Sequence, residues 1–458
     1  MDFLRPHEYI TDMLLILKNI ITVFRYGVFL LITVVLSTAL HAGADTAKVR
    51  SMINAVSSDS LIKHIQTLER AGGYYNRISY TPGNDTVVRY IYNTFKGYKR
   101  LTTVDYDTFY MASAPLPYNQ KPLVNIVATL RGKKEPNKYV LVGGHLDCSA
   151  SRVGTSDWPS KWETISAPGA DDNATGVAAV LELARIFSDS TFEFSNDYSL
   201  IFIAFGNEEG VPNNISPGLS GSAHYAQESK LRGMNILGLI NLDMIGYNPL
   251  KIYADIVSNA ASVWIGQQCI EANNLYQLGI ATNSVPFIEG GYSDHYMFWS
   301  NGYPAILLIE HAWPWTTDIN YPASPHYHKP SDTLGTLNIP MVRALTQLTL
   351  GALASIGTSS ATAVQKYSLL PEYAILDQNY PNPFNGITTF SLQLTETQKV
   401  TLNIFDLLGR EVATVIDEWI PPGVFTRKWD SGGLPTGFYF YQLRAGQVLQ
   451  TKTLQLIK

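Results

Sequence analysis

Four continuous apolar runs in the middle of the chain are typical of strands buried on both faces. They are Tyr139–Val142, Ser199–Phe205, Leu237–Leu242 and Ala305–Ile309. Between the first two runs, apolar residues recur at 3.6-residue spacing and predict a helix: Val177, Val180, Leu181, Ala184 and Phe187. Strands that alternate with helices form βαβ units. The pattern therefore predicts an α/β fold, with a twisted, mostly parallel central sheet and helices on both faces.

The pattern changes after about residue 355. Residues 356–375 are rich in Ser, Thr and Ala without periodicity, which is typical of a linker. Short alternating runs follow, such as Thr401–Phe405 and Phe438–Leu443, and Gly- and Pro-containing turns separate them. This spacing predicts a small immunoglobulin-like β-sandwich over residues 376–458. The α/β domain is expected over residues 45–355.

The N-terminal residues 1–44 have the pattern of an export signal. Lys18 and Arg25 precede the uncharged run Tyr26–Leu40, and small residues follow at Ala42 and Ala44. The run approaches the length of a membrane span, so a retained anchor is the alternative. We expect cleavage after Ala42 or Ala44, and a mature protein that does not span the membrane.

Composition narrows the class of protein further. The chain has 458 residues, of which 46% are hydrophobic and 16% charged, as in globular proteins. Its net charge is −5 and it has no basic block, which makes nucleic acid an unsuitable partner. The two cysteines, Cys148 and Cys269, could form one bridge but exclude a disulfide-built scaffold.

Acidic residues and a histidine follow three of the four predicted strands directly. His145 and Asp147 follow the first strand, Glu208 and Glu209 the second, and Asp243 the third. The carboxyl ends of parallel strands meet at one edge of a sheet, where ligands bind. We expect these side chains to converge there. Asp171, at the start of the helix, and His328, in a late loop, can reach the same edge.

The donor types predict a site for two divalent metal ions. Three carboxylates, of Asp171, Glu209 and Asp243, and one bridging hydroxide balance the charge of two such ions, and His145 and His328 add neutral nitrogen donors. Mixed nitrogen and oxygen ligation suits zinc. The residue pattern does not decide which glutamate of the Glu208–Glu209 pair ligates and which acts as general base.

Two further positions carry an expectation of their own. Asp147, two residues after His145, is placed to accept the second N–H of the imidazole. His326 lies two residues from His328 and is a rival ligand.

The motifs resemble the M28 family of zinc aminopeptidases over roughly residues 79–349. The matching segments are Gly-Gly-His145-Leu-Asp147, Gly-Ala-Asp171-Asp172-Asn, Glu208-Glu209-Gly, Asn-Leu-Asp243-Met and His328-Lys-Pro-Ser-Asp332-Thr. The resemblance implies that His145 and Asp243 hold one zinc ion, and that Glu209 and His328 hold the other. It implies that Asp171 bridges them, that Glu208 is the base, and that the Asp171–Asp172 peptide bond is cis.

The C-terminal segment resembles a type IX secretion system sorting domain. The residues that carry this resemblance are Asn379–Asn385, Ile404–Val412, Leu434–Tyr439 and Lys458. It implies that the secretion machinery recognises this domain, and that the protein is secreted or held at the surface of a Gram-negative-type bacterium.

Together these features predict an exported, monomeric metallo-aminopeptidase that hydrolyses the first peptide bond of peptides or proteins. Three alternatives remain. A glutaminyl-peptide cyclotransferase resembles this family but uses one zinc ion. A non-catalytic surface binding protein would keep only a vestigial site. A carboxypeptidase of related architecture would need a cation that holds the substrate carboxylate, and the sequence does not single one out.

Overall fold

The chain folds into two compact units, which divide between Ala361 and Thr362. The computed structural model describes residues 45–457 except 155–156, 287–292, 313–316, 318–319, 359–373, 377–378, 380, 395–396, 407–409, 422 and 447. The predicted export signal therefore lies outside the described residues.

The first unit is built on an eight-stranded sheet with the order β1-β2-β4-β3-β5-β8-β6-β7. The pairs β3–β4, β3–β5, β5–β8 and β6–β7 are parallel, and the other three pairs are antiparallel. The strands are β1 (Thr103–Phe109), β2 (Leu123–Leu130), β3 (Glu135–His145), β4 (Tyr198–Phe205), β5 (Asn235–Leu242), β6 (Tyr253–Ser258), β7 (Ala281–Pro286) and β8 (Ala305–Ile309). The centre of the sheet is thus parallel, as predicted.

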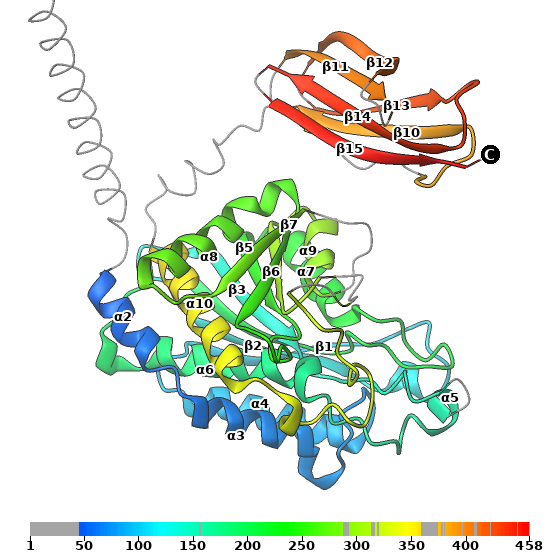
Figure 1. The fold of residues 1–458 in the computed structure, drawn as a ribbon. Coiled ribbons are helices and arrows are strands. Elements are labelled where there is room, and N and C mark those ends of the chain that lie inside the picture. Colours follow the sequence, from blue (N-terminus) through cyan, green and yellow to red (C-terminus); the bar gives the residue numbers. More distant parts are fainter. Residues whose placement is uncertain are drawn as a thin grey trace, which may run out of the picture. The chain divides into compact units, whose positions relative to one another are not determined.

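Helices pack on both faces of this sheet because neighbouring residues of each central strand point to opposite sides. Val140 of β3 and Phe202 of β4 join one hydrophobic core, while Leu141 and Ile203 join another. The first core contains residues of α2 (Thr46–Asn54), α3 (Ser58–Arg70), α4 (Pro82–Gly97), α6 (Gly176–Ser188), α8 (Val263–Tyr276) and α10 (Ile339–Thr358) (Figure 1). The second contains residues of α7 (Ser220–Leu231) and α9 (His295–Ser300), and a short helix, α5 (Asp157–Lys161), lies in a loop. The predicted fold class is confirmed.

Among the described residues, α10 alone is long and apolar enough to cross a membrane by length and composition. Of its most apolar window, 72% is buried inside the protein. Met341, Leu345 and Leu348 of this helix are in the first core. Burial among the other core elements therefore accounts for the apolar character of α10. The helix also extends to Thr358, into the segment predicted as a linker.

The second unit consists of two antiparallel sheets, of orders β13-β10-β9 and β12-β11-β14-β15. Its strands are β9 (Ala374–Leu376), β10 (Ile387–Leu394), β11 (Gln398–Phe405), β12 (Glu411–Ile420), β13 (Gly423–Asp430), β14 (Gly437–Ala445) and β15 (Val448–Leu456). Phe390 and Leu392 from one sheet share a core with Leu402, Tyr441 and Leu443 from the other. Two sheets that enclose one core form the predicted β-sandwich.

Candidate metal centre

Three adjacent strands bring the chemically active side chains to one edge of the sheet. The strands β4, β3 and β5 are neighbours, and His145 at the end of β3 pairs with Phe205 at the end of β4. Glu208 and Glu209 follow β4 within a few residues, and Asp243 follows β5 directly. The parallel order of these strands makes their carboxyl ends coincide.

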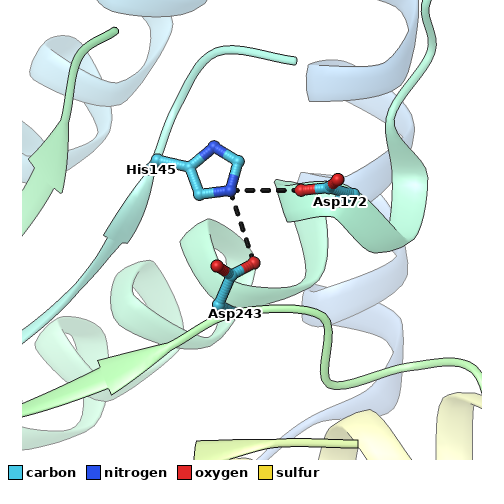
Figure 2. A group of neighbouring side chains, drawn as sticks. All are labelled: His145, Asp172 and Asp243. Atoms are coloured by element: carbon cyan, nitrogen blue, oxygen red, sulfur yellow. Dashed lines mark hydrogen bonds and ion pairs between the residues drawn. The ribbon is translucent and has the colours of Figure 1, made fainter. Parts of the chain in front are cut away.

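Two groups of potential metal ligands share the carboxylate of Asp172. The first group is His145, Asp172 and Asp243, and in each group the ligand atoms lie within 4.8 Å of one another. Nε2 of His145 lies 3.1 Å from Oδ1 of Asp172 and 3.3 Å from Oδ1 of Asp243 (Figure 2). The second group is Asp172, Glu209 and His328. Nε2 of His328 lies 3.0 Å from Oδ2 of Asp172 and 3.0 Å from Oε1 of Glu209.

The structure corrects one predicted position by a single residue. Asp172, and not Asp171, lies between the two histidines. Oδ1 of Asp171 instead accepts a hydrogen bond from the backbone N–H of Gly246, at 2.9 Å. The cis peptide bond is likewise one residue later than predicted, between Asp172 and Asn173. The two aspartates lie in a short irregular turn of π-helical type (Ala170–Thr175), in which the backbone dihedral angles of Asp172 and Asn173 are not helical.

The structure also separates the two rival histidines. His328 is in contact with Asp172 and Glu209, as described above. Nδ1 of His326 lies 3.0 Å from the hydroxyl of Ser331, and the ring of His326 packs against Tyr247. His328 is therefore the histidine of this pair that reaches the acidic cluster.

Glu208 and Glu209 face different parts of the cluster. Glu209 lies against His328, whereas Oε2 of Glu208 is 3.9 Å from Nε2 of His145. Oδ1 and Oδ2 of Asp147 accept hydrogen bonds from the backbone N–H groups of Glu208 and Glu209, at 3.0 and 3.2 Å. Nδ1 of His145 lies 3.6 Å from Oδ1 of Asp147, which is longer than a normal hydrogen bond. Asp147 thus holds the backbone of the glutamate pair.

Burial and mutual contacts shift the pKa values of these groups strongly. Burial raises the pKa of Glu209 to about 7 and that of Glu208 well above its usual range. Burial also acts to raise the pKa of Asp172, but hydrogen bonds from His145 and His328 lower it overall. Burial lowers the pKa of His328, yet Glu209 and Asp172 raise it to about 10. The carboxylates and imidazoles of this site depend on each other for charge compensation.

The donor set suits zinc. Each group offers one imidazole nitrogen and two carboxylate oxygens, and the shared Asp172 presents one oxygen to each histidine. His145, Asp172 and Asp243 are all buried, so their negative charge is poorly solvated and favours a cation. Nitrogen and oxygen donors in small number are the usual ligands of catalytic zinc.

A cavity of about 240 Å³ adjoins the second group. Glu209 and His328 form part of its wall, and the remaining lining side chains are uncharged, namely Ser149, Ser151, Trp158, Val211, Pro212 and Ser216. A ligand could therefore lie beside the cluster with a neutral group in this cavity.

Some residues at the site were not predicted from the sequence. Glu310 directly follows β8 and is fully buried, and it accepts hydrogen bonds from the backbone N–H of Tyr247 and the hydroxyl of Tyr321. Glu310 could have been predicted in the same way as the other site residues, because it is a polar residue directly after a predicted strand. Tyr327 lies close to the cluster, and burial together with Asp172 and Glu209 raises the pKa of its hydroxyl. No motif marked it beyond its position before His328.

Each of the two units matches the model of a known protein family. The model described as peptidase family M28 matches residues 125–353, and the model of the secretion system C-terminal sorting domain matches residues 378–458. The fold and the grouped donors are those of a metal-dependent α/β peptidase. The chain belongs to peptidase family M28 and carries a C-terminal type IX secretion sorting domain.

Individual proteins support this placement. A probable zinc metalloprotease of Pyrenophora tritici-repentis is 40% identical over 124 residues, which are 27% of this chain and 24% of the relative. A probable leucine aminopeptidase of Trichophyton verrucosum is 26% identical over 69% of this chain and 78% of the relative. The chain thus spans about a quarter of the length of the first curated relatives that it matches.

A solved structure shares the fold. The LapA aminopeptidase of Legionella pneumophila matches with a TM-score of 0.52 and 19% identity, over 68% of this chain and 75% of LapA.

Proposed function

We propose that this protein is an exported zinc-dependent aminopeptidase that removes the N-terminal residue of peptides or proteins. The observation that carries the proposal is the pair of ligand groups that share Asp172, with Glu208 beside them. His145, Asp172 and Asp243 would hold one zinc ion, and Asp172, Glu209 and His328 a second. Bound zinc supplies Lewis acidity, which polarises the scissile carbonyl group and makes water more acidic.

Glu208 acts as the general base in this proposal. Its carboxyl group lies close enough to His145 and Glu209 to form a third group with them, but it belongs to neither of the two groups that share Asp172. Burial raises the pKa of its carboxyl group above the usual range, which makes this group a stronger base than an exposed glutamate. Glu208 takes a proton from the attacking water and delivers it to the leaving amine.

Neighbouring residues keep these side chains in place. Asp147 fixes the backbone of Glu208 and Glu209, as described above. The hydroxyl of Ser293 donates a hydrogen bond to Oδ2 of Asp243 at 2.7 Å, which leaves Oδ1 directed at His145. Such outer partners orient ligands and are needed for full metal affinity.

The charge of the site suits a free peptide N-terminus. The substrate ammonium group is positive, and Glu208 and Asp243 are concentrated on the His145 side of the cluster. The cavity, whose other lining side chains are uncharged, lies next to Glu209 and His328. We place the ammonium group near the carboxylates of Glu208 and Asp243, where the negative charge attracts it.

The second unit supports a proposed location outside the cell. A type IX sorting domain directs its carrier to secretion. We propose that the mature protein acts outside the cell as a monomer, after export through the signal predicted in residues 1–44.

Hydrolysis of a panel of aminoacyl-anilides tests the activity and its metal dependence. Chelation should abolish hydrolysis, zinc should restore it, and metal analysis should give two zinc ions per chain. Glu208→Gln keeps the shape of the side chain but removes the base, so kcat should fall by roughly 10²–10⁴-fold. Glu228→Gln is the matched control, since Glu228 of α7 pairs at the surface with Arg232, which directly follows this helix.

Two results would oppose the proposal. Full kcat in the Glu208→Gln variant would exclude Glu208 as the base. One zinc ion per chain, together with cyclisation of peptides that begin with glutamine, would identify a cyclotransferase instead.

A further inference from the structure

A buried arginine from outside the segment that matches family M28 contacts the loops of the metal centre. Arg77 lies between α3 and α4, whereas the family match begins at residue 125. Its side chain is among the largest in the chain that are fully buried, with an exposed fraction of 1%. Burying a guanidinium group is costly unless its N–H groups find acceptors, so its partners indicate what it does.

Among the described residues, the guanidinium group of Arg77 donates hydrogen bonds to four backbone carbonyls, which lie around the candidate ligands. Nε donates to the carbonyl of Leu146 at 3.0 Å, next to His145. Nη1 donates to Pro168. Nη2 donates to Gly169 at 2.6 Å and to Asp172 itself at 3.2 Å. One side chain therefore connects the backbone beside His145 to the turn that carries Asp172.

Asp332 holds the same turn from the N–H side. Its Oδ1 accepts from the N–H of Asp171 at 2.9 Å, and its Oδ2 accepts from that of Asp172 at 3.1 Å. Arg77 and Asp332 also attract each other electrostatically. The turn is thus bound by a cation through its carbonyls and by a carboxylate through its amides, which leaves the backbone at Asp172 little freedom.

Gly169 makes the close approach of Arg77 possible. Its φ is +54°, in the left-handed region that favours glycine. A Cβ atom there would lie 2.4 Å from the carbonyl oxygen of Asp172 and 2.8 Å from Nη2 of Arg77. The backbone conformation of this turn and the position of the guanidinium group therefore depend on each other.

We propose that Arg77 is a positioning residue for the metal centre, and that it acts with Asp332 to hold Asp172 where both groups of ligands can use it. The proposal rests on zinc binding at this cluster, as set out above. Without the guanidinium group, four buried carbonyls lose a donor, and the turn can relax away from His145 and His328. The N-terminal helical region then contributes to zinc affinity as well as to the core.

The test is the zinc dissociation constant of the full chain, measured by competition with a chromophoric chelator after metal removal. Arg77→Met should raise this constant roughly 10–100-fold, the loss typical of outer partners of metal ligands. Arg77→Lys keeps the charge, but one ammonium group cannot reach all four carbonyls, so we expect an intermediate increase. The unfolding temperature of each metal-free variant is recorded in parallel.

Arg185→Met is the control for general destabilisation. The guanidinium group of Arg185 donates to the carbonyl of Ala55 at 2.9 Å and pairs with Glu182, in contacts that include none of the candidate ligands. This variant should unfold at a lower temperature yet bind zinc as the wild type does. Wild-type zinc affinity in folded Arg77→Met or Arg77→Lys would overturn the proposal.

A folding failure of one variant can be distinguished from a failure of the proposed function. If Arg77→Met does not fold, the Arg77→Lys variant decides. If the wild type itself binds no zinc, the proposed function fails, and the positioning role fails with it.

Discussion

Asp171 and Asp172 are adjacent and both buried, but they contact different groups. Asp172 contacts both histidines of the cluster. Asp171 lies against the loop after β5, where it accepts the N–H of Gly246. Its pKa is raised well above the usual range by burial and by the neighbouring Asp332. The two side chains therefore connect the same turn to two different parts of the site.

Substitution of each aspartate by asparagine should separate these roles. Asp172→Asn removes the shared negative charge, so zinc affinity and kcat should each fall by at least roughly 10²-fold. Asp171→Asn keeps an oxygen that can accept from Gly246, and its effect should stay within roughly tenfold. Zinc competition and anilide hydrolysis measure both.

The comparison between the two variants decides the assignment. Equal losses in zinc affinity would contradict the separate roles, and a larger loss in Asp171→Asn would restore Asp171 as the shared ligand.

Much of the site could be predicted because strand ends are visible in the sequence. Apolar runs located β3, β4 and β5, and the polar residues after them were expected to meet. The choice between Asp171 and Asp172 could not be made in this way, because it depends on the backbone dihedral angles of an irregular turn. Arg77 gave no signal either, since its partners are backbone carbonyls, which any sequence provides.

At the scale of elements, the same reasoning explains which strands were missed. The run Ala305–Ile309 coincides with β8, and the other three apolar runs lie within β3, β4 and β5. By contrast, β1 is mostly exposed and its pattern is not apolar. Buried polar residues interrupt the apolar pattern of β2 and β6. In β2, Asn125 donates hydrogen bonds to Asp107 and Gly221. In β6, Asp255 accepts hydrogen bonds from Tyr253 and Ala312. Polar groups with such partners are stable inside a sheet but conceal its strands.

Helix α3 contains a histidine that should make the protein sensitive to acid. His64 is buried, its Nδ1 lies 2.7 Å from the hydroxyl of Tyr90, and burial lowers its pKa to about 4. An unfolded histidine titrates near about 6.5, so the unfolded state binds the proton more readily between these values. The free energy of unfolding should therefore fall as the pH decreases from about 6.5 to about 4, by at most about 3 kcal/mol from this group.

Denaturant unfolding of wild type and His64→Gln at pH 7 and pH 4.5 measures this contribution. The difference between the two pH values should be smaller in the variant. His224→Gln is the control, because Asp107 raises the pKa of His224, and its loss should alter the pH dependence in the opposite direction. An unchanged pH dependence in His64→Gln would refute the prediction.

At the scale of the whole molecule, the described residues of the two units form separate hydrophobic cores, and the main core of the first unit shares no residue with the core of the sandwich. The core around the central sheet draws on residues between Val49 and Ile356, and the core of the sandwich on residues between Ala374 and Leu456. The ligand groups, Glu208, Arg77 and Asp332 all belong to the first unit. The family matches divide in the same way, with the peptidase in one unit and the sorting domain in the other.

A chain shortened after Ala361 should therefore keep its metal centre. Because a separate core supports the first unit, the shortened chain should fold and bind zinc within about twofold of the full chain, as expected for distant, independent parts. Zinc competition and thermal unfolding check this, and the full chain is the reference. Loss of zinc binding in a folded, shortened chain would mean that the sandwich contributes to the site. A shortened chain that does not fold would mean that the two cores stabilise each other. In either case the sorting domain would have a structural role in the peptidase as well as its role in secretion.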